Sequence, residues 1–373
     1  MTSDGYQGPA HQDPLHLLFI CPTVAGYIGG TETVVSQFCQ RLRHKARLTL
    51  LSGEPGPGRP CLIESAGMEL RTLPFAARDS RLNRVLSKLL MTSPFKIESR
   101  SFFRSLQRSG IDLAQYDRIV TFYEADAYLL AKRYPALRER CRHFLPGVSM
   151  RGFFKQVPAR DVFYLGYRAA EKTRRKWGLE IASLPLGVDE RFFPPSPPPY
   201  PAAKRLLYIG RLDGSKNVDW LADFFMHSSL PQQGYHLDIV GDGPLLAGLL
   251  AKHGQSASMT FHGRQGQAEV IGLLRQAFLL LHPTDLESFG LTILEGMAAG
   301  IPVLTHELDS IKVWARDYPR YPARLDAAAW TREILQFEQP AYWREVSAAG
   351  LDYAKTFTWQ RVADQVLELI ASR

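Results

Sequence analysis

The amino-acid sequence predicts an α/β fold built from two Rossmann-like, doubly wound domains. Short apolar runs alternate with segments of helical periodicity, the alternation restarts after a proline-rich stretch, and 373 residues are enough for two separate cores. In the first half we expect buried strands at residues 15–21, 47–51 and 118–122 and a helix at 31–42. This alternation predicts parallel strands covered by helices.

The second half repeats the order more regularly. Strands are expected at 205–209, 236–240, 259–262, 278–281 and 301–304, and helices at 218–226, 244–252, 268–276, 291–299 and 359–370. Six prolines within residues 193–201 exclude a helix or a central strand there and predict an extended linker. The expected division is a disordered tail at 1–14, a first domain at 15–193, a linker at 194–201, a second domain at 202–356 and a terminal helical segment at 357–373.

The composition excludes several classes of protein. No run approaches the roughly 18 apolar residues of a membrane span, and the polar N-terminus lacks the pattern of a secretory signal. The four cysteines form no CxxC pair, so we expect neither a zinc site nor a disulfide framework and predict a reduced, cytoplasmic protein. The net charge of +8 comes without any nucleic-acid-binding motif, so nucleic acid is not an expected partner.

Residues 78–108 carry much of the positive charge. This stretch has eight basic and two acidic residues, a net charge of +6. Apolar residues recur in it at the spacing of one helix face, at Leu82, Val85, Leu86, Leu89 and Leu90. Such a helix can lie on an anionic membrane surface, or it can pack its apolar face inward and leave a solvated basic back. The pattern alone leaves both readings open.

Two carboxylates stand eight residues apart at the expected start of the helix at 291–299. Glu287 lies in the loop after a buried strand, and Glu295 lies in the second helical turn. The backbone N–H groups of Phe289, Gly290 and Leu291 would lack partners inside the helix and could bind an anion. A single Glu here is explained by helix-end electrostatics, whereas two at this spacing favour a site for a polar ligand.

Other loops that follow expected strands carry residues suited to a phosphate. Arg211 and Lys216 lie in a loop that begins at Gly210, and two cations there could hold a diphosphate or be solvated surface charges. Further candidates are Gly241 and Gly243, His262 and Arg264, and, at the first helix, Gly29 and Gly30. For each of these, a tight turn or a helix cap is the alternative explanation.

These motifs together resemble the retaining enzymes of glycosyltransferase family 4, which have the GT-B fold. The resemblance rests on residues 287–304, 208–217, 240–244, 184–194, 357–359 and 28–32, and is more specific in the second domain than in the first. It implies two Rossmann-like domains facing across a cleft, with a last helix that crosses back to the first domain. The implied roles are donor diphosphate binding for Arg211 and Lys216, contact with the transferred sugar for Glu287, and ribose binding for Glu295.

The resemblance also implies an activity. The chain would transfer a sugar from a nucleotide diphosphate donor, with a UDP-sugar favoured over GDP-mannose, to a hydroxyl of a lipid-linked or saccharide acceptor. Lipopolysaccharide, glycolipid or exopolysaccharide synthesis would use such a reaction at the inner face of the cytoplasmic membrane. No cofactor or metal is expected, because cations and helix N-termini supply the electrostatic stabilisation.

The first domain departs from the family pattern at one point. Pro146 stands where many members have a histidine near the reacting sugar, which leaves Glu124 and His143 as candidates on the acceptor side. An alternative is therefore a catalytically idle GT-B protein that binds a nucleotide-sugar or a partner glycosyltransferase. A sugar-nucleotide epimerase of the same fold is a further alternative, against which the arginine, lysine and two glutamates argue.

Overall fold

The computed structural model describes residues 14–27, 29–56, 61 and 63–372. The chain divides into two compact units, as expected for a two-domain α/β protein. Unit 1 comprises the residues up to 164 together with 179–182 and those from 363 onward, and unit 2 comprises residues 165–178 and 183–362. The expected N-terminal tail lies outside the described residues except for position 14.

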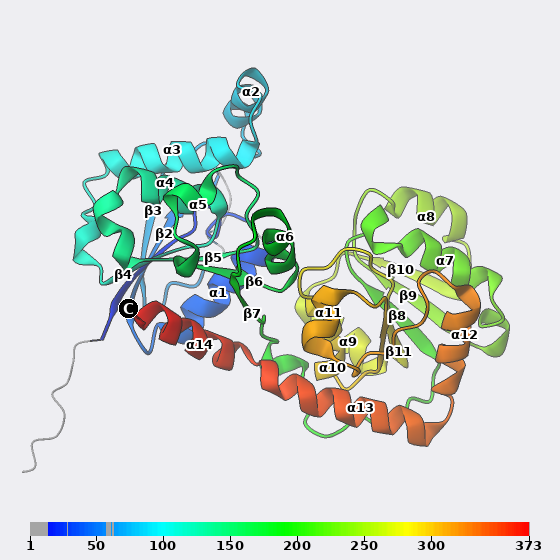
Figure 1. The fold of residues 1–373 in the computed structure, drawn as a ribbon. Helices are drawn as coiled ribbons and strands as arrows, with labels where there is room; N and C mark the ends of the chain where they lie inside the picture. The colour runs from blue at the N-terminus through cyan, green and yellow to red at the C-terminus, as the bar shows by residue number, and fades with distance from the viewer. Residues whose placement is uncertain (1–13, 28, 57–60, 62, 373) are drawn as a thin grey trace, which may run out of the picture. The chain divides into compact units, whose positions relative to one another are not determined.

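Unit 1 is organised around a sheet with the strand order β3-β2-β1-β4-β5-β6-β7 (Figure 1). The strands are β1 (His16–Ile20), β2 (Arg47–Gly53), β3 (Glu69–Leu73), β4 (Arg118–Thr121), β5 (Cys141–Leu145), β6 (Val162–Leu165) and β7 (Ala182–Leu184). The pairs from β3 through to β6 are parallel. Its helices are α1 (Gly30–Leu42), α2 (Arg81–Leu89), α3 (Pro94–Arg108), α4 (Glu124–Arg133) and α5 (Phe153–Gln156).

Unit 2 has a parallel sheet in the order β10-β9-β8-β11-β12. Its strands are β8 (Arg205–Ile209), β9 (His236–Val240), β10 (Met259–Gly263), β11 (Leu279–His282) and β12 (Val303–Thr305). Its helices are α6 (Arg168–Trp177), α7 (Val218–His227), α8 (Leu246–His253), α9 (Gln267–Gln276), α10 (Leu291–Ala298), α11 (Asp309–Ala315), α12 (Ala327–Gln336) and α13 (Pro340–Ala354). Short 3-10 helices connect several of these elements, among them Glu190–Phe192 and Gly214–Lys216.

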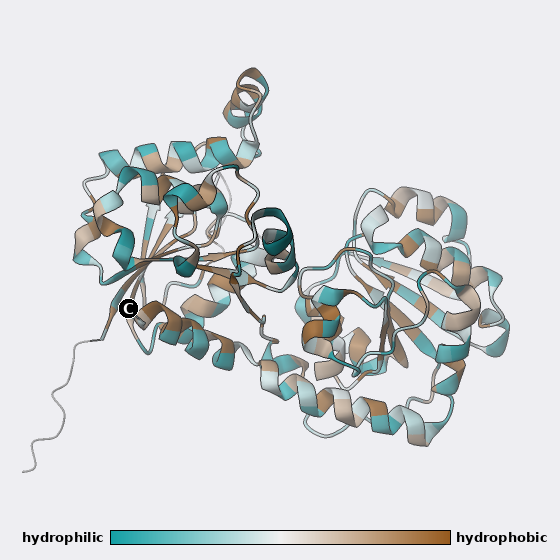
Figure 2. Ribbon diagram, in the orientation of Figure 1, coloured by the Kyte–Doolittle hydropathy of each residue, from teal (hydrophilic) through white to brown (hydrophobic). Residues whose placement is uncertain are grey.

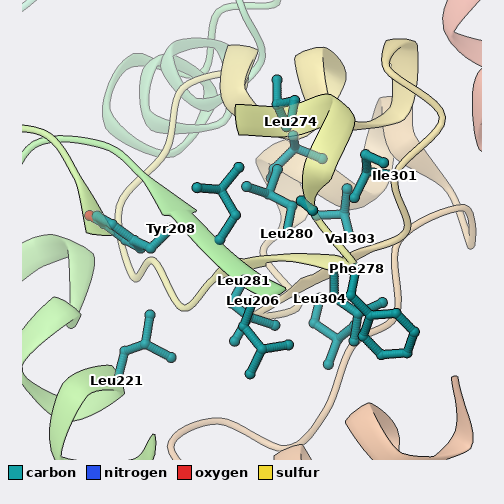
Figure 3. Packing of buried hydrophobic residues seen from close by; sticks show 14 of the residues in the cluster. Leu206, Tyr208, Leu221, Leu274, Phe278, Leu280, Leu281, Ile301, Val303 and Leu304 are labelled. Carbon is teal, nitrogen blue, oxygen red and sulfur yellow. The ribbon is translucent and has the colours of Figure 1, made fainter. Parts of the chain in front are cut away.

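The core of unit 2 is continuous from the sheet into the covering helices. Leu280 and Leu281 of β11 lie between β8 and β12 and are wholly buried (Figure 3). Val303 and Leu304 pair with them in register, so β12 extends the same apolar surface. Strands buried on both faces are mainly apolar in sequence, as β8 and β11 are.

The observed units differ from the expected domain boundaries. Residues 165–178 and 183–193, expected in the first domain, belong to unit 2. The proline-rich segment 194–201 is also part of unit 2 rather than a connection between units. Tyr200 packs edge-on against Phe278 and Trp343, with ring centroids 5.9 and 5.8 Å away. Proline excludes helix and central strand, but it does not prevent an extended segment from packing on a domain.

The last helix, α14 (Trp359–Ala371), contributes its residues from 363 onward to unit 1, as the expected return of the C-terminal helix requires. Lys45 pairs with Asp364 at 2.6 Å. Arg118 donates to the carbonyl oxygen of Ile370 at 2.8 Å, and Arg142 donates to that of Ser372 at 2.6 Å. The end of the chain is therefore held on unit 1 by polar contacts from β4 and β5 as well as by its apolar face.

The basic segment 78–108 forms two helices instead of one. Met91 adopts a left-handed backbone conformation with φ of 46°, and Pro94 starts α3. The helix α3 buries Ile97, Phe102 and Phe103, whereas α2 projects beside the start of α3 (Figure 1) and carries exposed hydrophobic residues (Figure 2). The inward-packing interpretation therefore holds for α3 and is wrong for α2.

Candidate functional site

Lys216 and Glu287 form an ion pair beside the sheet of unit 2. Lys216 follows β8 and Glu287 follows β11, and these two strands are neighbours. Nζ of Lys216 lies 2.6 Å from Oε2 of Glu287 and donates to the carbonyl oxygen of Leu286 at 3.0 Å. Both side chains are mostly buried, with 17% and 20% of their surfaces exposed. Two residues that sequence motifs placed in one site are thus in direct contact.

Glu287 also faces His282, the last residue of β11. Nε2 of this histidine lies 3.4 Å from Oε2 of Glu287. Burial alone would raise the pKa of Glu287, but His282 and Lys216 outweigh it and lower that pKa to about 2. The carboxylate is therefore ionised throughout the neutral range and can accept hydrogen bonds from hydroxyl groups.

Arg211, predicted to share the site with Lys216, pairs instead with Asp213. The guanidinium Nε lies 3.3 Å from Oδ2 of Asp213, and the arginine side chain is 71% exposed. Asp213 also caps the short helix that carries Lys216 by accepting from the backbone N–H of Ser215 at 3.0 Å. The structure leaves Arg211 in solvent, in the same loop as Lys216 but without a contact to it.

The N-terminus of α10 presents free backbone donors next to this pair. Gly290 precedes the helix with φ of 90°, a left-handed conformation that glycine adopts readily. Within the described part of the chain, no acceptor bonds to the backbone N–H groups of Phe289, Gly290 and Leu291. The phenyl ring of Phe289 is buried and stacks on Trp314 at 4.5 Å, so its side chain anchors the loop while its amide remains available.

The loop at 287–289 is held by residues that the sequence motifs did not indicate. The carbonyl oxygen of Ser288 accepts from the backbone N–H of Tyr167 at 2.9 Å, and Trp314 donates through Nε1 to the carbonyl oxygen of Phe289 at 2.7 Å. A Cβ at Gly166 would lie 2.8 Å from the oxygen of Ser288, so only glycine allows this approach. The start of α6 thus supports the loop from within unit 2.

Glu295 lies on α10, and its side chain has no hydrogen-bond partner among the described residues. Burial, with a smaller contribution from the nearby Asp189 carboxylate, raises the pKa of Glu295 to about 7. A carboxyl group in this state is half-ionised at neutral pH and lacks the donors that would stabilise its charge. A ligand with hydroxyl groups would supply those donors.

The glycines after β8 and β9 bring two loops into close contact. A Cβ at Gly241, where φ is 141°, would lie 1.8 Å from the carbonyl oxygen of Gly210, and one at Gly243 would lie 2.4 Å from that of Leu212. The backbone N–H of Leu212 donates to the carbonyl oxygen of Asp242 at 3.0 Å. Their small size is therefore needed for loop packing, whether or not a ligand also approaches them.

His262 and Arg264 differ in their surroundings. Nε2 of His262 lies 2.7 Å from Oδ1 of the buried Asp238, which also accepts from Arg205 at 2.6 Å. This histidine is engaged within the sheet, on β10 and β9. Arg264 is exposed. Neither residue contacts Lys216 or Glu287.

Two further groups near Glu287 were missed by the sequence analysis. Asp285 accepts from Arg324 at 2.8 Å and lies 3.1 Å from Nδ1 of His306; Arg324 is the main cause that lowers the pKa of Asp285 to about 2. The second is His282, whose buried Nδ1 has no hydrogen-bond partner in the described structure. His282 directly follows the strand expected at 278–281, and this position could have identified it as a candidate from the sequence.

In unit 1, Gly29 and Gly30 begin α1. Gly29 is extended, with φ of −160°, and a Cβ there would lie 2.5 Å from Oε2 of Glu32. Position 28 of the same motif lies outside the described residues. Glu32 accepts from Thr23 at 2.6 Å and also bonds to the hydroxyl of Tyr123, so this glycine loop is next to a buried carboxylate network.

The two acceptor-side candidates have different environments. Glu124 accepts from the backbone N–H and hydroxyl of Ser149 at 2.8 and 2.9 Å, and it lines a cavity of about 380 Å³ together with Pro146. His143 lies inside the sheet on β5, with Nδ1 2.8 Å from Thr121, and burial lowers its pKa to about 3. The structure therefore keeps Glu124 as a candidate and removes His143, because a buried neutral ring cannot reach a substrate.

Cys21, Cys39 and Cys141 are buried free thiols, and Cys61 is an exposed one. No three His, Cys, Asp or Glu side chains are grouped to hold a metal ion in the regions that the structure describes. In the same regions, no helix is both long and apolar enough to cross a bilayer.

Residues 203–337 match the family model described as Glycosyl transferases group 1. The phosphatidyl-myo-inositol mannosyltransferase of Mycobacterium tuberculosis is 25% identical over 94% of this chain and 95% of its own length. The O-antigen chain mannosyltransferase B of Escherichia coli is 28% identical over 43% of this chain, and the match spans only 44% of that relative.

A solved structure of HepE from Anabaena in complex with UDP and glucose has a TM-score of 0.71 with this structure. It covers 96% of this chain and 100% of its own, at 14% identity. At this identity, the likeness concerns the fold.

Proposed function

We propose that this chain, which belongs to the GT-B-fold glycosyltransferases and resembles family 4, transfers a sugar from a nucleotide diphosphate donor with retention of configuration. The acceptor is a hydroxyl of a lipid-linked or saccharide molecule, as the names of the mannosyltransferase relatives suggest. A UDP-sugar and a mannosyl donor such as GDP-mannose are the two donor classes to compare, because one neighbour was solved with UDP and glucose.

The observation that carries this proposal is the Lys216–Glu287 pair at the start of α10. A diphosphate there would meet one ammonium group and the free N–H groups of residues 289–291. Anions bind at helix N-termini because the amides and the helix dipole both favour negative charge. The same groups would stabilise the charge that develops on the diphosphate as the bond to the sugar breaks.

The two glutamates divide the recognition of the donor. Glu287 is ionised and fixed by Lys216 and His282, which suits a contact to sugar hydroxyls whose geometry decides which sugar is accepted. The side chain of Glu295 has no hydrogen-bond partner in the described part of the chain and a raised pKa, which suits a pair of ribose hydroxyls that would complete its hydrogen bonds. The roles of Arg211, Gly29 and Gly30 remain predictions that depend on a bound donor.

We further propose that α2 docks the protein on an anionic membrane surface, which would place it at the inner face of the cytoplasmic membrane. Exposed apolar side chains cluster on and just after this helix, at Leu82, Val85, Leu89, Leu90, Met91 and Phe95. Arg81, Arg84 and Lys88 lie on the same helix. Apolar area combined with cations is what interfacial helices use on anionic lipids.

A thermal-shift screen of the full chain against UDP- and GDP-sugars tests the donor assignment. Binding to the folded state stabilises it by an amount that grows with the logarithm of ligand concentration over Kd, so one nucleotide-sugar should raise the melting temperature more than its free sugar or ATP does. Release of free sugar from that donor then separates an enzyme from an idle binder. If no nucleotide-sugar raises the melting temperature, the proposal is contradicted. If one does but no sugar is released or transferred, the protein is a nucleotide-sugar binder and not a transferase.

A further inference from the structure

The helices α3 and α4 of unit 1 line a cavity of about 550 Å³ that is strongly cationic. The two helices pack side by side (Figure 1). Lys96, Arg100 and Arg104 repeat every four residues along α3, and Lys132 and Arg133 end α4. This spacing puts the three cations of α3 on one helix face. The lining contains these five cations and Tyr128, with no Asp or Glu.

No acidic side chain among the described residues neutralises the five cations. Within the described part of the chain, none of them forms an ion pair, and Arg133 has a single side-chain hydrogen bond, to Oε1 of Gln107 at 2.9 Å. Partial burial, together with repulsion from Arg104 and Arg100, lowers the pKa of Arg133. Arg100, Arg104 and Lys132 are exposed, and Lys96 and Arg133 are half-buried. Like charges held close together repel one another, and a bound anion relieves that repulsion.

A second cavity, of about 380 Å³, adjoins the cationic one, and its lining includes acidic side chains. The two share Lys96, Ala125 and Met150 in their linings. Glu98, Glu124 and Asp126 line the second cavity, and Asp126 is fully buried beside Ser99. Carboxylate oxygens are acceptors for hydroxyl donors, so this cavity suits a polyol.

We propose that the cationic cavity binds a phosphate group carried by the acceptor, and that the adjoining cavity receives the hydroxyl-bearing part of the same molecule. The acceptor is then a phosphorylated polyol or saccharide. A neutral saccharide would give five cations nothing to pair with, whereas arginine forks and lysines match phosphate oxygens closely. The term acceptor rests on the proposed function, but the anion site itself does not.

The shared chemistry is a phosphate ester, borne either by a lipid in a bilayer or by a soluble molecule. Two probes separate these sources: inorganic pyrophosphate followed by calorimetry with the site in unit 2 saturated by UDP, and vesicles of phosphatidylcholine with or without phosphatidic acid followed by co-sedimentation. Each is applied to the full-length wild type, to Arg100→Gln/Lys132→Gln and to a control, Arg108→Gln/Lys172→Gln. The control removes the same charge from exposed positions outside the cavity.

The cavity variant should bind at least one probe about tenfold or more weakly than the control, because two charge-assisted contacts are lost. Selective loss of vesicle binding assigns a lipid-borne phosphate, and selective loss of pyrophosphate binding assigns a soluble one. Equal binding by the two variants to both probes, or no binding by the wild type, would overturn the proposal. UDP affinity is measured in parallel: the site in unit 2 should be unaffected in both variants, so a failure of the donor assignment remains distinguishable.

Discussion

Nζ of Lys216 lies 2.6 Å from Oε2 of Glu287, although 71 residues separate them in the chain. The contact arises because β8 and β11 are adjacent in the sheet and the loops after them meet at the same edge. The pair carries opposite charges into a mostly buried position and leaves both groups next to the free amides of α10. A ligand that binds Lys216 must therefore be compatible with a fixed carboxylate beside it.

Glu287→Gln should destabilise the protein at neutral pH. The folded-state pKa is about 2 against an ordinary value of 4.5, so the stabilisation is present above about pH 4.5 and is lost as the pH falls toward 2. The loss at pH 7 should be on the order of 3 kcal/mol. Urea unfolding at pH 7 and pH 3 measures it, with the exposed Glu345→Gln as a control. An equal deficit at both pH values would refute the assigned ion pair.

Nucleotide affinity should depend on the ionisation of Glu295. The carboxyl has a pKa of about 7, and ribose hydroxyls donate to its charged form, so affinity should rise as the pH increases through 7. Calorimetric titration with UDP and GDP between pH 6 and 8 tests this, and Glu295→Gln removes the titrating group. The ratio of wild-type to variant affinity should increase by up to about tenfold in total between pH 6 and pH 8. A constant ratio would mean that Glu295 does not contact the nucleotide.

Gly241→Ala should strongly destabilise unit 2. The backbone there has φ of 141°, and the added Cβ would lie 1.8 Å from the carbonyl oxygen of Gly210. Strain and displacement of the loop together should reduce the free energy of unfolding by about 3 kcal/mol or more. Gly248→Ala is the matched control, because a Cβ there meets no atom within 4 Å in α8 and should stabilise by roughly 0.5–1 kcal/mol. Similar melting temperatures for the two variants would contradict the close approach.

Binding to anionic vesicles should depend on the apolar face of α2. Leu82→Ser/Val85→Ser/Leu89→Ser keeps all cations but removes apolar area, and should weaken co-sedimentation about tenfold or more. Leu250→Ser/Val313→Ser removes exposed hydrophobic residues from unit 2 and is the control. Wild-type binding by the α2 variant would show that this helix is not the docking surface.

The sequence predicted local structure best where a residue type permits few backbone conformations or environments. Largely apolar runs predicted β8, β11 and β12 to within one or two residues, because strands buried on both faces show little polar alternation. The strands β9 and β10, which contain polar residues, were predicted equally closely. Proline predicted an extended segment at 194–201, but not that Tyr200 would anchor it on unit 2. Glu287 and Lys216 were predicted to share a site, whereas their direct pairing depends on sheet order, which periodicity does not encode.

Other features depend on long-range packing and were missed for that reason. His143 lies on a strand that was not expected, so its burial could not be anticipated. The support of the loop at 287–289 by Tyr167 joins residues more than a hundred positions apart. The amphipathic pattern at 78–108 could not show that α3 packs inward while α2 is left uncovered, because both have the same periodicity.

The most direct test of the account is the rate of sugar transfer, or of donor hydrolysis, by Lys216→Ala compared with wild type and Lys252→Ala. Lys252 pairs with Asp223 on the surface of the same unit, so its loss removes a lysine without affecting the site. Removing one electrostatic stabiliser of the leaving group commonly reduces kcat by about 100-fold or more. The account predicts that reduction for Lys216→Ala alone, measured at saturating donor. Equal turnover by all three proteins would contradict it.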